Sequence, residues 1–441
     1  MIGGIGLNDK DRTNDIAQQN GSDSQAVSAP TVENKLWTKD FTIITIGSMI
    51  SMVGNTMAGF AASLFVLDYT QEPAYYAFYV FLYTLPQILS PILSGPLMDR
   101  FSRRRTIYML DFISAGIYTI SGILIYLKFF NFGFLALMTF IIGTINSVYS
   151  VAYSSFYPLL ISEGNYSKAY SIASTLETLT FVVVPIATFL YKSFGIFPLL
   201  LANGACFFLA GSFEVRISDV EALSLRKVET DKYDMKKYFA DTKDGIKYLF
   251  SEKALLLVAL YFTFSAFSGG ASGVMTLPWF KETFENGEYI FMSVAVFMML
   301  GRMVGGLFHY KVKLPTNKKF SIALIVYICI SLIEGVYLYA SLNVMRLACL
   351  IMGLMGVTSY NIRISATQSY VPNDWKGRFN GAFIMLNTVG TLLGQLCAGA
   401  LVNFLPMRVV LSLIMTLCAI SAVIFIGGGK KYVAPLYNRQ S

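Results

Sequence analysis

Long apolar runs recur along the chain, and short polar segments separate them. A helix that crosses a hydrocarbon core about 30 Å thick needs about 20 residues, because each residue advances the helix by about 1.5 Å. The runs "FTIITIGSMISMVGNTMAGFAASLFVL" and "FGFLALMTFIIGTINSVYS" reach that length. The pattern therefore predicts helices that span a membrane.

These runs predict twelve transmembrane helices in two groups of six. The first group is expected at 41–67, 74–97, 106–128, 132–158, 168–190 and 195–213, and the second at 254–277, 288–309, 320–340, 344–368, 378–402 and 407–427. The groups give an N-terminal six-helix bundle at 41–213 and a C-terminal six-helix bundle at 254–427. A charged, solvated and amphipathic loop at 214–253 connects them. We expect a disordered tail at 1–40 and a short tail at 428–441.

The composition agrees with a membrane protein. Of the 441 residues, 55% are hydrophobic and only 14% are charged. Soluble domains carry about 25% charged residues. The mean hydropathy of +0.57 therefore places most of the chain in lipid rather than in water.

Basic residues are concentrated in alternate loops. Segments 98–105, 214–253 and 310–319 are rich in Lys and Arg, whereas the loops "DYTQEP", "FKETFENGEY" and "YASLN" hold only Lys281. By the positive-inside rule, the basic loops and both termini are cytoplasmic, in a multi-pass protein of the plasma membrane. The net charge of +8 thus reflects topology, and the separated basic residues predict no nucleic-acid partner.

The sequence offers little material for catalysis or metal binding. His309 is the single histidine, which argues against a histidine metal site or a Ser-His-Asp triad. The five cysteines lie in apolar helices without CxxC pairing, and no GxxxxGK[ST] motif is present. We therefore expect no metal, no cofactor, no enzyme activity and no ATP-driven pump. A membrane-embedded enzyme or a lipid scramblase is a remote alternative to a transporter.

The chain also repeats itself weakly. A shift of 210 residues aligns "GPLMDR" at Gly95–Arg100 with "GGLFHY" at Gly305–Tyr310, and "LISEGNYSKAYS" with "YVPNDWKGRFNG". Two matches in one register indicate two homologous halves. Such halves support alternating access, with substrate held between them near the middle of the membrane.

The stretch "GPLMDRFSRRRTI" resembles the loop motif between helices 2 and 3 of the major facilitator superfamily. With "YTLPQILSPILSGPLMDRFSRRRTIYMLDF" and "DTKDGIKYLFSEKALLLV", the chain resembles the branch that holds macrolide-efflux proteins and the bacterial enterobactin exporter. The similarity covers most of residues 41–427. It implies an all-α integral membrane protein, with twelve transmembrane helices in two pseudo-symmetric six-helix bundles. We expect a monomer in the lipid bilayer.

The resemblance also assigns a cytoplasmic gate motif. Its members here are Gly95, Asp99, Arg100, Arg103 and Arg104. The family pattern places the Asp99 carboxylate against the positive end of the helix that starts near Gly377–Asn380, with Arg103 as an ion-pair partner. This contact would latch the two halves shut on the cytoplasmic side. Arg100 and Arg104 have a simpler interpretation, as residues that fix topology only.

In this fold, helices 1, 4, 7 and 10 line the substrate cavity, and each carries polar side chains at helical spacing. The candidates are Asn55; Asn146, Tyr149 and Tyr153; Tyr261 and Ser265; and Asn361 and Arg363. Tyrosine and methionine surfaces would suit a bulky, amphipathic solute. The alternative is that these stripes are contacts between helices. In helix 11, Gly390, Gly394 and Gly399 predict a close approach to neighbouring helices.

Acids inside apolar helices are the candidates for proton coupling. Glu177 is the first, because nine residues beyond Lys168 place it about 13 Å into the membrane. A glutamate that only bonds neighbouring hydroxyls is the alternative. Asp111, which could instead pair with Arg104 or Arg105, and Glu334 are further candidates.

The expected function is secondary active export of a hydrophobic or amphipathic small molecule, of the drug or macrolide type, by proton antiport. One departure bears on coupling, because Phe140 or Ile141 occupies the place where drug/proton antiporters often carry an arginine in helix 4. A dedicated exporter of a siderophore or small peptide is the alternative.

Overall fold

The computed structural model describes residues 35–88, 102–162, 165–218, 235–312 and 314–439, apart from some side chains inside these ranges. The secondary structure assigned within these ranges is helical. Gly95, Asp99 and Arg100 lie outside the described residues. The predicted latch at Asp99 is therefore untested and stays a prediction.

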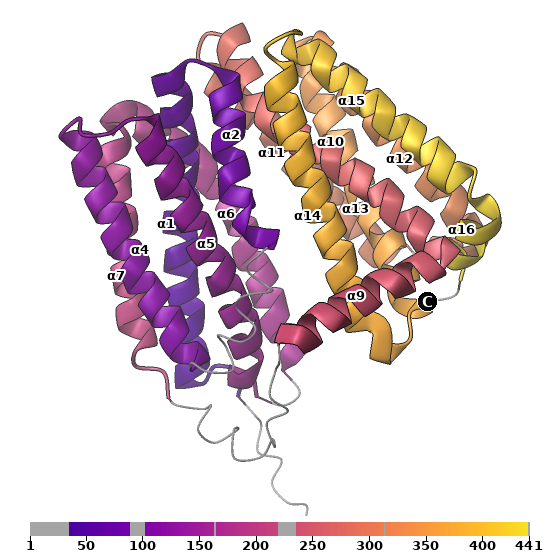
Figure 1. Ribbon diagram of the computed structural model, residues 1–441, viewed down its shortest axis with the longest axis horizontal. Coiled ribbons are helices and arrows are strands. Elements are labelled where there is room, and N and C mark those ends of the chain that lie inside the picture. The colour runs from indigo at the N-terminus through magenta and orange to yellow at the C-terminus, as the bar shows by residue number, and fades with distance from the viewer. Residues whose placement is uncertain (1–34, 89–101, 163–164, 219–234, 313, 440–441) are drawn as a thin grey trace, which may run out of the picture. The chain divides into compact units, whose positions relative to one another are not determined.

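The helices follow the predicted order (Figure 1). The first group comprises α1 (Lys39–Thr70), α2 (Pro73–Thr84), α4 (Arg103–Tyr126), α5 (Phe132–Phe156), α6 (Tyr166–Phe194) and α7 (Ile196–Glu214). After α9 (Met235–Ser251), the second group comprises α10 (Lys253–Thr283), α11 (Gly287–Lys311), α12 (Lys319–Val336), α13 (Leu342–Tyr370), α14 (Asn373–Leu401) and α15 (Met407–Ser421), followed by α16 (Lys430–Tyr437).

Within the described ranges, ten segments are helical, long and apolar enough to cross a membrane. The other two predicted spans correspond to α2 and α6. Residues 89–97 of the second predicted span lie outside the described ranges, and several side chains of α6 do as well. The prediction of an all-helical, multi-pass membrane protein is confirmed. The proposed domain boundaries stay a prediction.

Local capping explains where several helices begin. The Thr38 side chain accepts a hydrogen bond from the Phe41 amide at 3.1 Å, and Asn131 accepts one from the Phe134 amide at 2.8 Å. Each bond satisfies one of the amides that a helix leaves unpaired in its first turn. Pro73 starts α2, where a missing amide hydrogen costs nothing.

Glycines of α14 lie where backbones come close together. A Cβ atom at Gly390 or Gly394 would meet the carbonyl groups of Thr263 or Phe267 in α10, and one at Gly399 would lie 2.8 Å from the Cβ of Ala77 in α2. These positions have no room for a side chain. The close approach predicted for the eleventh transmembrane helix, which is α14 here, is confirmed.

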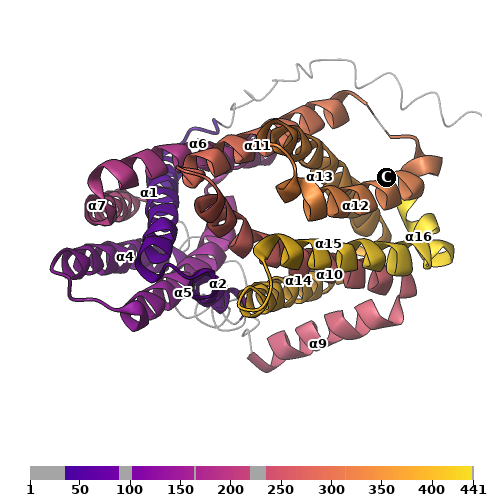
Figure 2. The same cartoon turned by 90° about the horizontal axis from the view of Figure 1, so that it is seen from above.

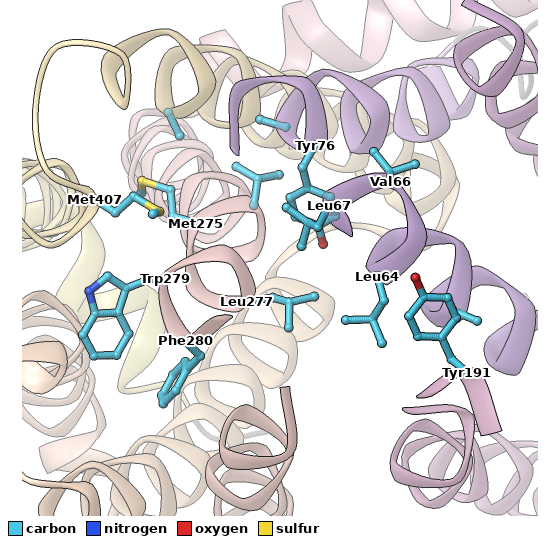
Figure 3. Packing of buried hydrophobic residues seen from close by; sticks show 14 of the residues in the cluster. Leu64, Val66, Leu67, Tyr76, Tyr191, Met275, Leu277, Trp279, Phe280 and Met407 are labelled. Carbon is cyan, nitrogen blue, oxygen red and sulfur yellow. The ribbon is translucent and has the colours of Figure 1, made fainter. Parts of the chain in front are cut away.

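One hydrophobic cluster includes residues of both groups of helices. Figure 3 shows Leu64 and Tyr76, from α1 and α2, on one side and Met275 and Leu277, from α10, on the other. All four side chains are buried. The two groups therefore pack together through α1, α2, α10 and α14, within the compact unit formed by Leu36–Ser441.

The segment between the groups contains a helix that packs on the second group. Figure 2 shows α9 beside α14 and α10. The Tyr248 ring stacks on Trp375 with ring centroids 4.8 Å apart, and Tyr370 donates a hydrogen bond of 2.9 Å to Glu252 just beyond α9. The sequence predicted a solvated amphipathic connector. Its C-terminal part is instead docked by aromatic contacts that the local pattern did not reveal.

Candidate functional site

A cavity of about 460 Å³ lies among the first group of helices and reaches α14. Polar and aromatic side chains make up most of its wall, namely Ser51, Asn55, Tyr83, Gln87, Asp111, Ser114, Asn146, Ser147, Tyr149, Ser150, Phe207 and Thr388, with Met52, Ile145, Val151 and Ile384. Ligand pockets of about 300–1,000 Å³ accommodate drug-sized molecules. The cavity has the size and mixed chemistry of a site for an amphipathic solute.

Three of the predicted cavity residues line this pocket, and two of them are held by tyrosines. Asn146 donates a hydrogen bond of 3.1 Å to the Tyr83 hydroxyl, and Asn55 accepts one of 3.0 Å from the Tyr118 hydroxyl. These bonds join α5 to α2 and α4 to α1. The amides are therefore positioned before any solute enters.

Tyr149 is the third predicted residue in the pocket wall, and Tyr153 lies one turn further along α5. The Tyr153 ring stacks between Tyr149 and Tyr157, with centroid distances of 5.9 and 5.2 Å. The spacing correctly placed the three rings on one helix face. Tyr153 is outside the pocket wall, so its role in the cavity stays a prediction.

The residues predicted on the seventh and tenth transmembrane helices, which are α10 and α13 here, lie away from this pocket. Tyr261, Ser265, Asn361 and Arg363 are absent from its wall. Tyr261 is buried and stacks on Tyr327 at 4.5 Å. The Arg363 guanidinium lies 4.9–5.3 Å from the centroids of three rings, those of Phe262, Tyr360 and Phe383. These contacts stabilise the second group of helices.

Asp111 is the predicted proton-coupling residue that reaches the pocket wall. The alternative expected for Asp111 was an ion pair with Arg104 or Arg105. The prediction is wrong for Arg104, which forms no ion pair with Asp111. Arg104 donates a hydrogen bond of 2.6 Å to the Val215 carbonyl, while Arg103 donates one of 3.2 Å to the Ser155 carbonyl. Both arginines thus tie the start of α4 to other parts of the first group.

Glu214 lies beside Asp111, a neighbour that the sequence pattern did not predict. The predicted helix ended at residue 213, which assigned Glu214 to the central loop, but α7 includes it. Both carboxyl groups have no exposed surface, and they interact directly with each other. The signal in the sequence is an acid at the end of an apolar run, where one more residue of helix places it inside the bundle.

The other two candidates for proton coupling are Glu334 and Glu177. Glu334 of α12 accepts a hydrogen bond of 2.7 Å from Ser272 of α10, within the second group and away from the pocket. The side chain of Glu177 lies outside the described residues. Both residues stay predictions as proton carriers.

Charged contacts join the two groups at the other end of the bundle, called here the Asp68 end. Lys281 of α10 pairs with Asp68 of α1, which also accepts a hydrogen bond of 2.6 Å from Tyr191. Lys192 of α6 pairs with Glu288 of α11 at 2.6 Å. The sequence had singled out Lys281 only as the lone base of the alternate loops. Its partner in a distant helix was not predictable from local pattern.

The residues present do not assemble a metal site in the described part of the chain. No three His, Cys, Asp or Glu side chains come together there as metal ligands would. Asp111 and Glu214 supply carboxylate oxygens from two residues, which are fewer ligands than a zinc or calcium ion takes.

The sequence profile of the Major Facilitator Superfamily matches residues 44–395 of this chain. An uncharacterized MFS-type transporter, YkuC of Bacillus subtilis (strain 168), is 24% identical over an alignment of 287 residues that covers 62% of this chain. The aligned region spans 66% of that relative, slightly less than two thirds of its length.

Solved structures share the fold at low sequence identity. The nucleoside transporter NupG has a TM-score of 0.64 at 12% identity and covers 88% of this chain and 98% of its own. A bacterial homologue of the iron transporter ferroportin has a TM-score of 0.64 at 14% identity, with 87% and 98% covered. A peptide transporter, POT, has a TM-score of 0.63 at 11% identity, with 90% and 95% covered.

Proposed function

Because the chain belongs to the Major Facilitator Superfamily and is a membrane transporter rather than an enzyme, we propose that it exports a hydrophobic or amphipathic small molecule by proton antiport. The observation that carries this proposal is a buried acid, Asp111, in the wall of a 460 Å³ pocket. Acids are costly within a membrane and occur there mainly for function.

The wall of the pocket supports the proposed substrate class. Tyr83, Tyr149 and Phe207 supply ring surfaces, and Asn55 and Asn146 supply amides that can turn to a solute. Rings bind apolar groups of varied shape, while the amides and hydroxyls satisfy polar groups. A site of this kind would accept several amphipathic molecules.

The proposed cycle uses alternating access between the two groups of helices. With the Asp68 end closed, solute enters the pocket from the cytoplasm, and Asp111 releases a proton. When the Asp68 end opens, the solute leaves and Asp111 takes a proton from outside. The proton gradient thereby drives the solute outward.

The alternative of a siderophore exporter is less well supported by this pocket. None of the wall residues that the structure describes is basic. An anionic siderophore would therefore face an uncompensated carboxylate at Asp111 without an attractive partner. A small peptide with a free amino group is compatible with the wall.

Transport by the purified protein in proteoliposomes tests the proposal. An amphipathic drug or dye should accumulate only while a pH gradient is present, and the Asp111→Asn variant should lose gradient-driven transport. Exchange of a neutral solute without a gradient should persist in that variant. Transport that ignores the gradient for every solute would refute proton antiport.

A further inference from the structure

Asp111 and Glu214 form a carboxyl pair that is built into the packing of three helices. A Cβ atom at Gly47 of α1 would lie 3.1 Å from Glu214 Oε1, and one at Gly211 of α7 would lie 3.3 Å from the Cβ of Asp111. Side chains at these positions would crowd both carboxyl groups. The two glycines therefore leave room for acids at a place where apolar residues would normally pack.

The oxygens of this pair are poorly satisfied by the protein. Ser51 donates a long hydrogen bond of 3.4 Å to Asp111 Oδ2. Asp111 Oδ1 and both Glu214 oxygens are buried without a hydrogen-bond donor among the described residues. Carboxylate oxygens only accept, so the contact between the two groups becomes a hydrogen bond only when one carries a proton. Two bare carboxylates here would repel each other.

No described basic side chain forms an ion pair with Asp111 or Glu214. Arg104, at the start of the helix that carries Asp111, donates a hydrogen bond to the Val215 carbonyl. The neighbours that face the pair are Tyr149 from α5 and neutral hydroxyls of α1, including Ser51. The compensating positive charge must therefore come from outside these residues, as a proton or as part of a ligand.

Asp111 is the member of this pair that borders the pocket, and it is the one charged residue among the described residues of the pocket wall. Ring faces of Tyr83, Tyr149 and Phe207 belong to the same wall. Aromatic faces attract a desolvated cation, and a buried carboxylate attracts it more strongly. An anion would be repelled by the carboxylate and by the ring faces. The wall thus selects for positive charge on an otherwise amphipathic molecule.

We propose that the pocket binds an organic cation, a protonated amine or quaternary ammonium or phosphonium, with its charge at Asp111. Glu214 is a positioning residue behind Asp111. Its carboxyl group makes a bare carboxylate on Asp111 unfavourable until the cation arrives. On binding, the O–H bond of Asp111 breaks, the proton leaves to water, and the cation takes its place. One positive charge enters and one departs.

This inference rests on the proposed function in one respect, that the pocket is the substrate site, but binding can be measured without transport. The probes are tetraphenylphosphonium and tetraphenylborate, which have nearly the same size and shape and opposite charge. Binding of each to the full chain in nanodiscs, between pH 6 and pH 8, needs no variant. Tetraphenylphosphonium should bind at least tenfold more tightly than tetraphenylborate, and its affinity should rise at least fivefold over this pH range as protons compete less.

Three variants then locate the charge. Asp111→Asn should weaken tetraphenylphosphonium binding at least tenfold and remove its pH dependence. Glu214→Gln should keep measurable binding but shift the rise in affinity to lower pH, because Asp111 loses its proton more easily beside a neutral amide. Glu282→Gln, which removes an exposed carboxylate at the end of α10, is the matched control and should bind as the wild type does.

Equal binding of the two probes, or wild-type binding by a monodisperse Asp111→Asn variant, would overturn the cation site. An unchanged pH profile in Glu214→Gln would remove Glu214 from it. If the protein exports a neutral drug against its gradient but does not bind tetraphenylphosphonium, the proposed export function stands and the inference of a cationic substrate fails.

Discussion

Lys192 on α6 and Glu288 on α11 form an ion pair of 2.6 Å between the two groups of helices. Lys192 lies in the last turn of its helix and Glu288 in the first turn of the other, so each charge also complements the dipole of its own helix. The pair formed by Asp68 and Lys281 crosses between the groups at the same end. Together the two pairs join the two groups of helices at the Asp68 end.

Reversing one of these charges should favour opening of the Asp68 end. Lys192→Glu places two negative charges together, and the repulsion removes a contact that exists only in the closed state. A cysteine at Leu277, which is buried in the cluster between the groups, should then react at least fivefold faster with an impermeant maleimide added outside cells.

The double variant Lys192→Glu with Glu288→Lys should restore slow labelling, because it rebuilds the pair in the opposite sense. Glu285→Lys reverses an exposed charge at the same end and serves as the control. Fast labelling in the double variant would mean that the pair does not hold the groups together.

Cysteine labelling also tests the predicted orientation of the chain. Cysteines introduced at Lys247 of α9 should react only from the cytoplasm, and those at Thr283 only from outside. The reason is the concentration of Lys and Arg on the α9 side of the membrane. Labelling should be measured in intact cells and in inverted vesicles, in a chain without its native cysteines. The reverse pattern would contradict the orientation and the proposed direction of transport.

The close contact between α14 and α10 predicts a specific loss of stability. Gly394→Ala adds a methyl group against the Phe267 carbonyl, which forces the helices apart and should cost about 1–3 kcal/mol. Gly381→Ala in the same helix adds a methyl group where no atom lies within 4 Å. Thermal unfolding in detergent should show a lower midpoint for the first variant and an unchanged one for the second. Equal midpoints would show that α14 can move away without cost.

Two acids compete for the role of proton carrier, and their neutral variants separate them. If Asp111 carries the proton, Asp111→Asn should abolish export driven by a pH gradient, while Glu177→Gln should reduce it less than threefold. If Glu177 is the carrier, as its predicted depth first indicated, the order is reversed. Initial rates in proteoliposomes with and without a gradient give the comparison. Loss of gradient-driven export in both variants would indicate that a proton passes between the two acids.

The helices, the family and part of the candidate site could be predicted from the amino-acid sequence. Apolar runs set the spans because lipid requires about 20 apolar residues in each. Helical spacing placed Asn146 and Tyr149 on one face of α5, and both line the pocket. Asp111 stood out because acids inside apolar runs are rare.

Which of these residues contact one another could not be predicted, because it depends on how the helices pack. Asp68 and Lys281 are 213 residues apart, and Asp111 and Glu214 lie on different helices of the same group. Periodicity fixes which side chains share a helix face, but not how that helix is rotated against its neighbours. That rotation is set by packing, such as the glycines at Gly47 and Gly211 that admit the two acids. Local pattern carries no record of such contacts.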